Sequence, residues 1–332
     1  MERIAAILVI FVLLINGRHV ERRLPQAPHA MVVTAVPIPL DTSDPNRRML
    51  GPLAYLGGWS LEGTGGDIGG VSSMRLDDHG DLLALNDTGE VATFRPGRAS
   101  TPGVLMPLPA FSDEARDPKW HWDTESMAHD PASGKTWVGF ELNARICRYS
   151  ASFAHVERCA SPAEMLAWPK PTGLESLVRL ADGRFLGIAE EYPGPAGGHD
   201  VLLFAGDPVS PATPAPARLS YQAPEGYLPT DALVIGNGWM LVLNRRVTVV
   251  DGFTGVLTLV DIRDLKPGAL LTGAVVARFA GSIQHDNLEA LAMSREAGRP
   301  ILWVASDDNH LFFQRSLLLK FAMPAQWFAP RR

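Results

Sequence analysis

The chain has 332 residues, of which 46% are hydrophobic and 20% charged, a composition sufficient for a large folded core. Its net charge of −6 excludes the basic surface that nucleic-acid-binding proteins carry. The 31 glycines and 27 prolines suit many tight turns, and helical periodicity is almost absent.

The N-terminus carries an apolar run of 12 residues, Ile4–Ile15, behind Arg3. A membrane-spanning helix needs about 20 apolar residues, so this run better fits the core of a signal peptide. Glu2 offsets part of the upstream positive charge, and no clean cleavage site follows. We therefore expect residues 1–17 to be a signal peptide or a short membrane anchor, with a buried strand or helix as the alternative. Either form of export places the protein in the periplasm or outside the cell, with an inner-membrane anchor if the segment is retained.

Residues 18–52 are rich in Pro and Arg and are expected to form a linker. From about residue 55 onward, one pattern returns every 50 to 58 residues. It consists of an acidic or small residue, a β-run, a glycine, and a second β-run that ends in an acid or amide. Repeats of this length built from short strands are typical of β-propellers, with one four-stranded blade per repeat. The sequence therefore predicts an all-β fold, a single propeller over residues 53–332.

Five repeats predict five blades, but the fifth supplies only three strands, Leu288–Met293, Ile301–Ser306 and Ser316–Met323. We expect an N-terminal strand at Leu53–Leu61 to provide the missing outer strand, because this closure removes the open edge between the first and last blades. The long and weakly patterned stretch Pro96–Trp122 leaves a six-bladed propeller open.

The two cysteines, Cys147 and Cys159, lie in adjacent expected strands that are joined around Phe153. Phe153 is midway between them, so the two cysteines fall opposite each other across the hairpin. This placement predicts a disulfide, which suits an oxidising compartment. The alternative is a pair of free, half-buried thiols.

Acidic residues recur at two positions of the repeat. The mouth of the innermost strand carries Glu125, Glu175, Asp231 and Glu289, with Ser72 in the first repeat. The end of the second strand carries Asp87, Glu141, Glu190 and Asp307, with Asn244 in the fourth repeat. Because a propeller converts sequence period into rotation about one axis, we expect these carboxylates to converge on that axis.

Carboxylates gathered in a partly dehydrated channel must be protonated, paired with Arg, hydrated or neutralised by a cation. Hard cations such as calcium take about six to eight oxygen ligands. All eight acids are therefore expected metal ligands, and calcium is the expected cofactor. The alternative is that each acid ties two blades together by accepting backbone N–H groups.

Other side chains near these acids are candidates for substrate contact or proton transfer. His121 is expected to transfer protons, as are three further histidines, His129, His285 and His310, unless they are ordinary surface groups. Trp122 is expected to line a pocket or to pack between blades. Arg145, Arg245 and Arg246 are expected to bind an anionic substrate or to pair with the acids. The sequence contains no zinc-type cysteine and histidine spacing, nucleophile elbow, phosphate-binding loop or dinucleotide fingerprint.

Several motifs, in order, resemble those of the phytase-like family, known by the description "esterase-like activity of phytase". They are Gly69–Met74 followed by Leu82–Gly89, then Asp123–Glu125, Gly173–Leu177, Asp286–Leu291 and Ser306–Asn309. The resemblance covers about residues 53–323. It implies a secreted propeller with phosphoester or ester hydrolase activity and calcium bound by the axial acids. The chain departs from the family pattern after three of the glutamates, where Ser126, Ser176 and Ala290 replace a frequent Gly, and at Asp231, which replaces Glu.

Together these features favour a calcium-dependent phosphoester or ester hydrolase that acts on a small anionic or ester substrate. Its expected catalytic residues are Glu125, Glu175, Glu289 and His121. A non-catalytic periplasmic binding or scaffold propeller is one alternative, and a sugar-lactone hydrolase on a similar propeller is another. We expect a monomer with no nucleic-acid partner and with membrane contact only through the N-terminus.

Overall fold

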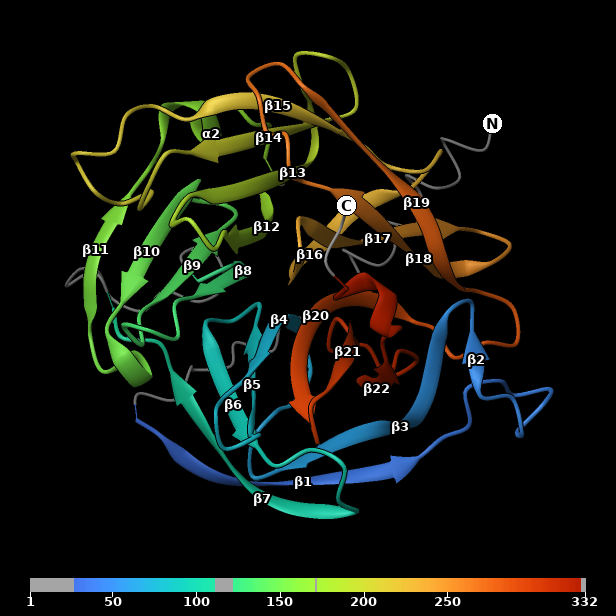
Figure 1. Ribbon diagram of the computed structural model, residues 1–332. Helices are drawn as coiled ribbons and strands as arrows, with labels where there is room; N and C mark the ends of the chain where they lie inside the picture. Colours follow the sequence, from blue (N-terminus) through green and yellow to red (C-terminus); the bar gives the residue numbers. More distant parts are fainter. Residues whose placement is uncertain (1–26, 111–121, 171, 330–332) are drawn as a thin grey trace.

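The computed structural model describes residues 27–110, 122–170 and 172–329 (Figure 1). Their regular structure is almost entirely β-strand, with one short α-helix, α2 (Ala163–Leu166), and 3-10 turns at Ala151–Phe153 and Ala325–Trp327. The predicted signal peptide or anchor at 1–17 lies outside the described residues. Within the described ranges, no helix is both long and apolar enough to cross a membrane.

The described strands form five antiparallel units arranged around a common centre, and pairings between outer strands join them into three sheets of 10, 4 and 8 strands (Figure 1). The first unit contains β4 (Val71–Leu76), β5 (Leu82–Asn86), β6 (Glu90–Phe94) and β7 (Ser100–Pro107). The second contains β8 (Thr124–His129), β9 (Thr136–Phe140), β10 (Arg145–Tyr149) and β11 (Val156–Ala160). The third contains β12 (Leu174–Arg179), β13 (Phe185–Pro193), β14 (His199–Phe204) and β15 (Ala217–Gln222). The fourth contains β16 (Leu228–Gly236), β17 (Trp239–Thr248), β18 (Gly252–Asp261) and β19 (Leu270–Phe279). The fifth contains β20 (Asn287–Glu296), β21 (Arg299–Asp307), β22 (Leu317–Ala322) and β3 (Leu53–Thr64).

The innermost strands β4, β8, β12, β16 and β20 contact one another in that order, and β20 contacts β4 again. This closed ring of first strands confirms the predicted all-β propeller. Strand β7 lies in the stretch 96–122 that left a sixth blade open, and it is the outer strand of the first unit.

The closure of the ring by an N-terminal strand is also confirmed. Strand β3 pairs antiparallel with β22, with Ser60 opposite Leu317 and Ala54 opposite Ala322. The last unit is therefore completed by residues from the other end of the chain, which covers an edge that would otherwise be open to association.

The prediction of a linker at 18–52 is wrong for the residues of that range that the structure describes. Strand β1 (His29–Pro37) pairs with β3 on one side and with β7 on the other, so it joins the fifth unit to the first. Its burial alternates, with Met31 and Val33 buried and Val32 exposed. This alternation, apolar side chains on one face of a strand, stabilises β1 and was hidden by the Pro-rich and Arg-rich composition around it. A short strand, β2 (Met49–Leu50), also pairs with β3.

The hydrophobic core lies between neighbouring units. Trp137 of the second unit, for example, packs edge-on against Phe185 of the third, with ring centroids 4.8 Å apart. Each unit packs one face against the next unit around the ring. This packing holds the ends of the innermost strands near the axis rigidly. That rigidity positions the acidic side chains described below.

The predicted disulfide is confirmed. Cys147 and Cys159 face each other in the register of β10 and β11, with Cα atoms 4.0 Å apart, and they are bonded. The bridge joins a middle strand to the outer strand of the second unit, across the hairpin that turns at Phe153.

Breaking this bridge should destabilise the protein by about 2 to 3 kcal/mol, because the disulfide restricts the unfolded chain over a separation of 12 residues. We expect the denaturant midpoint to fall on reduction and to fall equally in a Cys147→Ser/Cys159→Ser double variant. A reducing agent should leave the double variant's midpoint unchanged. An unchanged midpoint on complete reduction of the wild type would contradict the prediction.

Candidate functional site

One face of the propeller collects the mouths of the innermost strands and the ends of the second strands. The Glu141 N–H donates to the Asp123 carbonyl oxygen at 2.9 Å, and the Glu190 N–H donates to the Gly173 carbonyl oxygen at 3.2 Å. The register of each inner hairpin slips by one residue at this end. Such a bulge leaves an extra residue unpaired and redirects its side chain. The extra residues in the second, third and fifth units are Glu125, Glu175 and Glu289.

The structure brings five carboxylates of the second and third units together. Asp123, Glu125 and Glu141 place one oxygen each within 4.8 Å of one another. Glu141, Glu175 and Glu190 do the same, so Glu141 belongs to both groups. Asp123 and Glu175 are buried, and the other three are half-buried. We call these five residues the axial carboxylate cluster.

Burial and mutual repulsion dominate the electrostatics of the cluster. Burial, followed by the charges of neighbouring acids, raises the pKa of Glu125 and of Glu175 well above the ordinary value. The same causes raise the pKa of Glu141 to about 11. In the absence of a cation the cluster therefore favours protonated carboxyl groups. A bound cation would favour the ionised form instead.

Arg245 pairs with two acids at the edge of the cluster. Its Nη2 donates to Glu190 Oε1 at 2.9 Å, its Nη1 donates to Asn287 Oδ1 at 2.8 Å, and Nη1 also contacts Glu289 Oε1. Burial lowers the pKa of Arg245, but Glu289 and Glu190 outweigh that effect and raise it overall. Of the two roles predicted for Arg245, the structure therefore shows the pairing with the acids.

The remaining predicted ligands lie toward the first and fifth units. Asn287 Nδ2 donates to Glu289 Oε1 at 2.7 Å and to Asp307 Oδ2 at 3.4 Å. Burial raises the pKa of Asp307 well above its ordinary value, and the charges of Glu289 and Asp87 raise it further. These three acids are near one another but fall outside both three-carboxylate groups.

His310 lies beside Asp87, toward the first unit. Its Nε2 is 3.4 Å from Asp87 Oδ1, and its Nδ1 is 3.1 Å from Asp67 Oδ2. The hydrogen bonds to Asp67 and Asp87 raise the pKa of His310 to about 10. His310 is therefore cationic at neutral pH and offsets part of the negative charge there.

The structure does not bring Asp231 to the cluster. In the fourth unit the register slips between Pro229 and Asp231, so Thr230 occupies the bulge position. Asp231 Oδ2 accepts the Leu291 N–H at 2.6 Å, and Oδ1 accepts the Ala232 N–H at 2.7 Å. Asp231 thus ties the fourth unit to the fifth, as the alternative interpretation expected. Its position in the repeat differs from that of the glutamates by one residue, which turns its side chain to the other side of the strand.

Replacing Asp231 with Ala should cost about 1 to 3 kcal/mol, because the Leu291 N–H loses its buried acceptor. The melting temperature should fall, but any stabilisation by calcium should persist unchanged. A thermal-shift titration of Asp231→Ala with calcium measures both effects. Loss of the calcium response in this variant would instead place Asp231 among the ligands.

Hydroxyl groups make similar links between neighbouring units. Ser126 Oγ donates to the Leu174 carbonyl oxygen at 2.7 Å, and Thr230 Oγ1 donates to the Leu288 carbonyl oxygen at 3.1 Å. Ser126 replaces a residue that is often Gly in the family pattern, so this departure has a structural role.

Three further predicted residues have simpler placements. Trp122 is buried in the core and packs edge-on against Phe140, with centroids 6.3 Å apart, so it lies between strands. Arg145 is half-buried at the start of β10 and pairs in register with Phe140. His121 lies outside the described residues.

The sequence prediction missed Asp123 as a site residue. It precedes β8 directly, is buried, and lies in one three-carboxylate group with Glu125 and Glu141. The sequence signal was a second acid two residues before Glu125, but only this one repeat has an acid at that position. Only the approach of Glu141 from the neighbouring strand shows that Asp123 belongs to the cluster.

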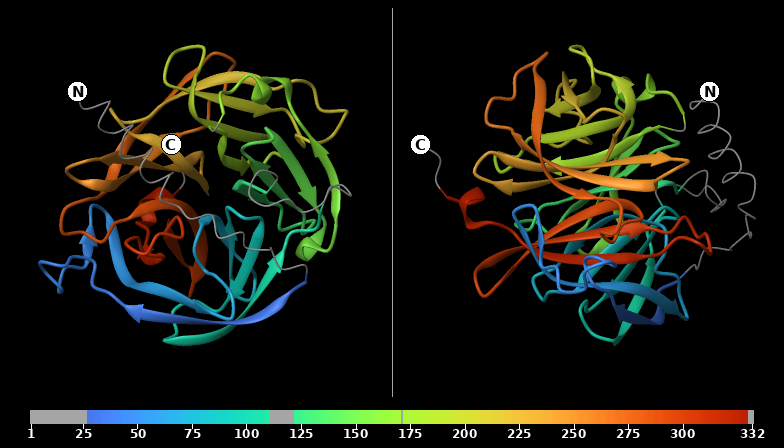
Figure 2. Two further views of the ribbon diagram at one scale, coloured as in Figure 1. Left: turned by 180° about the vertical axis from the view of Figure 1, so that it is seen from behind. Right: turned by 90° about the vertical axis from the view of Figure 1, so that its right-hand side faces the viewer.

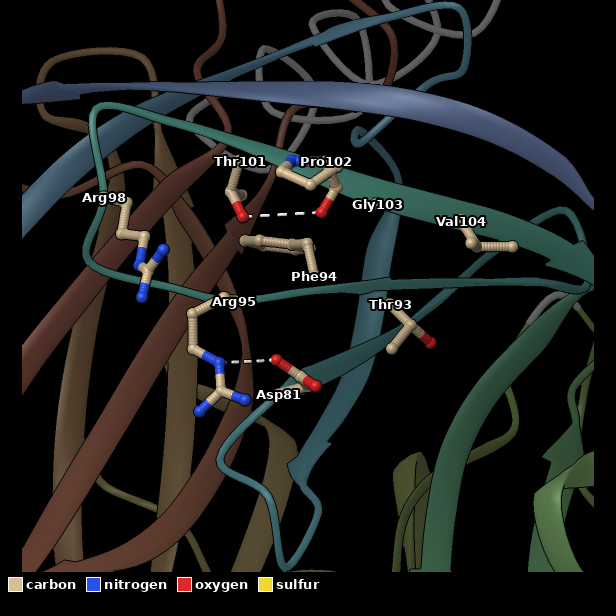
Figure 3. Close-up of a pocket in the computed structure, with 9 residues that line it drawn as sticks. All are labelled: Asp81, Thr93, Phe94, Arg95, Arg98, Thr101, Pro102, Gly103 and Val104. Carbon is tan, nitrogen blue, oxygen red and sulfur yellow. Dashed lines mark hydrogen bonds and ion pairs between the residues drawn. The ribbon is translucent and has the colours of Figure 1, made fainter.

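A cavity of about 670 Å³ lies elsewhere, on strands β6 and β7 of the first unit (Figure 3). Asp81, Arg95, Arg98 and Phe94 are among its lining residues, and Arg95 pairs with Asp81 at 2.6 Å. None of the predicted site residues lines it. The convergence of carboxylates near the axis is the stronger indication of chemistry, because an ion site needs ligand atoms rather than a large volume.

The oxygen-only composition of the axial carboxylate cluster suits a hard cation such as calcium. The three oxygens of each group lie within 4.8 Å of one another, close enough to share an ion, and Glu141 is common to both groups. The donor set offers no nitrogen or sulfur ligand of the kind that zinc prefers.

Weak similarities to solved structures accompany a clear match to one family. No curated protein matches the chain. Among solved structures, the Malassezia sympodialis allergen Mala s 1 matches with 16% identity over 86% of this chain and 92% of that one, at a TM-score of 0.45. The β-propeller domain of Cps50 (Swd1) from Myceliophteria thermophila matches with 9% identity over 88% of this chain and 98% of that one, at a TM-score of 0.41.

The family comparison is more specific. A family model with the description "Phytase-like: Esterase-like activity of phytase" matches residues 66–310, which include every acid of the axial carboxylate cluster. The match covers most of the chain and agrees with the motifs found in the sequence. This protein belongs to the phytase-like family.

Proposed function

We propose that this protein is an exported, calcium-dependent hydrolase of phosphoesters or carboxylic esters that acts at the axial carboxylate cluster. The observation that carries the proposal is the pair of three-carboxylate groups that share Glu141. Five carboxylates held this close by rigid strands raise one another's pKa, and such an arrangement costs folding free energy. Clusters of perturbed acids therefore occur most often at functional sites. Family membership supports the hydrolase class.

The five residues of the cluster would hold the cation. A bound calcium ion would polarise a phosphoryl or carbonyl oxygen and lower the pKa of a bound water. Glu175 and Glu125 lie within the cluster and would orient the attacking water. Glu289 is held by Asn287 and Arg245, and it would accept a proton at the edge of the cluster.

Arg245 gives this site a fixed positive charge. Because Glu190, Asn287 and Glu289 hold its guanidinium in place, it needs no reorganisation to meet an anionic oxygen of the substrate. An anionic or ester oxygen of a small substrate would be its partner. His121, which lies outside the described residues, stays a candidate for proton transfer.

Export is supported by two features. The apolar run Ile4–Ile15 has the length of a signal-peptide core, and the Cys147–Cys159 disulfide suits an oxidising compartment. We propose a periplasmic or extracellular location, with an inner-membrane anchor if the N-terminal segment is retained.

The test is hydrolysis of p-nitrophenyl phosphate and p-nitrophenyl acetate with and without calcium. Replacing Glu175 with Gln should lower the calcium-dependent rate by about a hundredfold or more, since the variant keeps the shape but loses the charge. Glu191→Gln is the matched control, because Glu191 is exposed beside Glu190 on the same strand. Equal rates in both variants would contradict the proposed site.

The pairing of Arg245 with Glu190 and Glu289 favours a second candidate, a non-catalytic binding propeller. An arginine can neutralise part of the acidic face without any metal. In that case neither ester is hydrolysed and calcium does not change the melting temperature. A sugar lactone included in the same assay tests the third candidate, a lactone hydrolase.

A further inference from the structure

Large apolar side chains project from the loops of the face that carries the acids. The loop after β21 begins at Asp307, which pairs with Asn287 at the mouth of β20, so this loop lies on the acidic face. The hairpin between β17 and β18 extends beyond Arg245 at the same end. Helix α2 follows the end of β11, which lies beside the start of β10 on that face. The exposed fractions on these loops are 99% for Phe312, 55% for Phe313, 62% for Val249, 92% for Val250 and 63% for Leu166.

The loop that carries Phe312 and Phe313 is held firmly at its base. Ser316 Oγ donates to Asp308 Oδ2 at 2.7 Å, and Arg315 Nη1 donates to Gln284 Oε1 at 3.0 Å. The two phenyl rings pack edge-on against each other with centroids 5.3 Å apart. A loop fixed by polar contacts at its base therefore presents a pair of exposed aromatic rings.

The N-terminal segment enters the described fold on the same face. His29, at the start of β1, pairs with Leu105 of β7, and the next residues of β7 run toward Pro107 opposite Glu90. Glu90 follows the end of β5, beside Asp87 of the acidic face. The residues that precede this point in the sequence include the apolar run Ile4–Ile15. The opposite face carries the turn Ala325–Trp327, which lies away from the loop after β21 in the side view (Figure 2).

We infer that the acidic face docks on a lipid surface, with Phe312, Phe313, Val249, Val250 and Leu166 inserted at the boundary between headgroups and acyl chains. These side chains come from three separate parts of the ring, so a fluid layer can receive them all at once. Interfacial binding strength scales with the apolar area that is buried. The described fold begins with β1 at this face, so an N-terminal anchor and the loop tips would reach one membrane together.

This orientation has a consequence for the site. The axial carboxylate cluster opens toward the lipid surface, because its strand mouths and the apolar loops share one end of the sheets. The acids on this face disfavour negatively charged headgroups. The surface that fits is therefore zwitterionic, and the inference does not depend on whether the cluster is catalytic.

The experiment is partitioning of the full-length protein into phosphatidylcholine vesicles, measured by co-sedimentation. A Phe312→Ser/Phe313→Ser double variant should partition at least about tenfold more weakly, because two exposed rings no longer leave water. Val36→Ser/Leu56→Ser is the matched control, since both side chains are exposed but lie on the outer strands β1 and β3. The control should partition like the wild type. The N-terminal run contributes equally to all three proteins, so the ratio reports the loops.

A second measurement keeps the inference testable if the double variant folds poorly. Val250→Ser, at a separate exposed tip, should also weaken partitioning without changing the melting temperature. Equal partitioning of the wild type and both tip variants would overturn the inference, as would binding that requires anionic lipid. A wild-type dimer that the Phe312→Ser/Phe313→Ser variant converts to a monomer without vesicles would also overturn it, in favour of a second copy as the partner.

Discussion

Calcium should stabilise this protein, and Glu141→Gln should remove most of that stabilisation. Glu141 is the carboxylate shared by both three-acid groups, so its replacement weakens every arrangement of ions in the cluster. A ligand present at one hundred times its dissociation constant stabilises a folded protein by about 2.7 kcal/mol. For a chain of this size we expect a rise of about 4 °C in melting temperature with calcium. Differential scanning fluorimetry with a calcium titration measures it.

The effect of calcium should grow with pH. Without a cation, the folded-state pKa of Glu141 is about 11, above its ordinary value of 4.5. A group with a raised pKa contributes stability that is fully present below about 4.5 and is lost as the pH rises toward the folded value. The chelated protein should therefore be more stable at pH 5 than at pH 8. Calcium binds the ionised carboxylates, so its stabilisation should be larger at pH 8.

Glu191→Gln provides the control for this experiment, because it removes an exposed carboxylate one residue from Glu190. The control should keep the calcium response of the wild type. If calcium changes neither protein's melting temperature at pH 8, the cluster is not a calcium site. The acids would then serve as a hydrated or protonated lining of the axis.

Replacing Arg245 with Met should destabilise the chelated protein by about 3 to 5 kcal/mol at neutral pH. The guanidinium bridges Glu190 and Glu289, and its loss leaves two poorly hydrated carboxylates beside other acids. Met preserves most of the volume, so packing changes little. Chemical unfolding monitored by tryptophan fluorescence measures the loss.

The destabilisation caused by Arg245→Met should shrink as the pH falls. The pKa values of Glu190 and Glu289 are already raised by burial, and Arg245 is the main influence that lowers them. Without Arg245 these pKa values rise further, so the stability of the variant falls as the pH increases above about 4.5. Near pH 4 both carboxyl groups are protonated in the folded and unfolded states, and the variant should approach the wild type.

Arg246→Met is the matched control for Arg245→Met. Arg246 is the next residue, lies 4.8 Å over the Tyr227 ring and is 3.6 Å from Asp251. Its replacement should cost only about 1 kcal/mol, with little dependence on pH. Equal losses and equal pH profiles for the two variants would show that the charge of Arg245 does not hold the acidic face together.

The local patterns of the sequence were sufficient to predict the architecture. The repeat of β-runs predicted the propeller, and the three-stranded last repeat predicted that β3 completes the ring. The equal spacing of the two cysteines about Phe153 predicted their pairing. These features depend on the period of strands and on hairpin register, both of which are properties of short stretches of chain.

The sequence did not predict strand β1. Its alternation of buried and exposed side chains spans only a few residues and lies within a Pro-rich and Arg-rich stretch. The strand is stable because β3 and β7, which are distant in the sequence, offer it two free edges. Composition alone therefore indicated a linker where tertiary pairing forms a strand.

The sequence by itself determined that acids recur at the strand mouths, and only the tertiary structure decided which of them meet. The repeat fixes the position of each acid along its strand only to within about one residue. Because successive side chains of a strand point to opposite faces, a bulge of one residue turns an acid to the other face. Asp231 therefore contacts the Leu291 N–H instead of the cluster, while Asp123 joins Glu125 and Glu141. Which acids join the carboxylate cluster and which pair with Arg245 likewise depends on distances between units, and Glu190 does both. Those distances are set by the packing of the five units against one another, which no single repeat encodes.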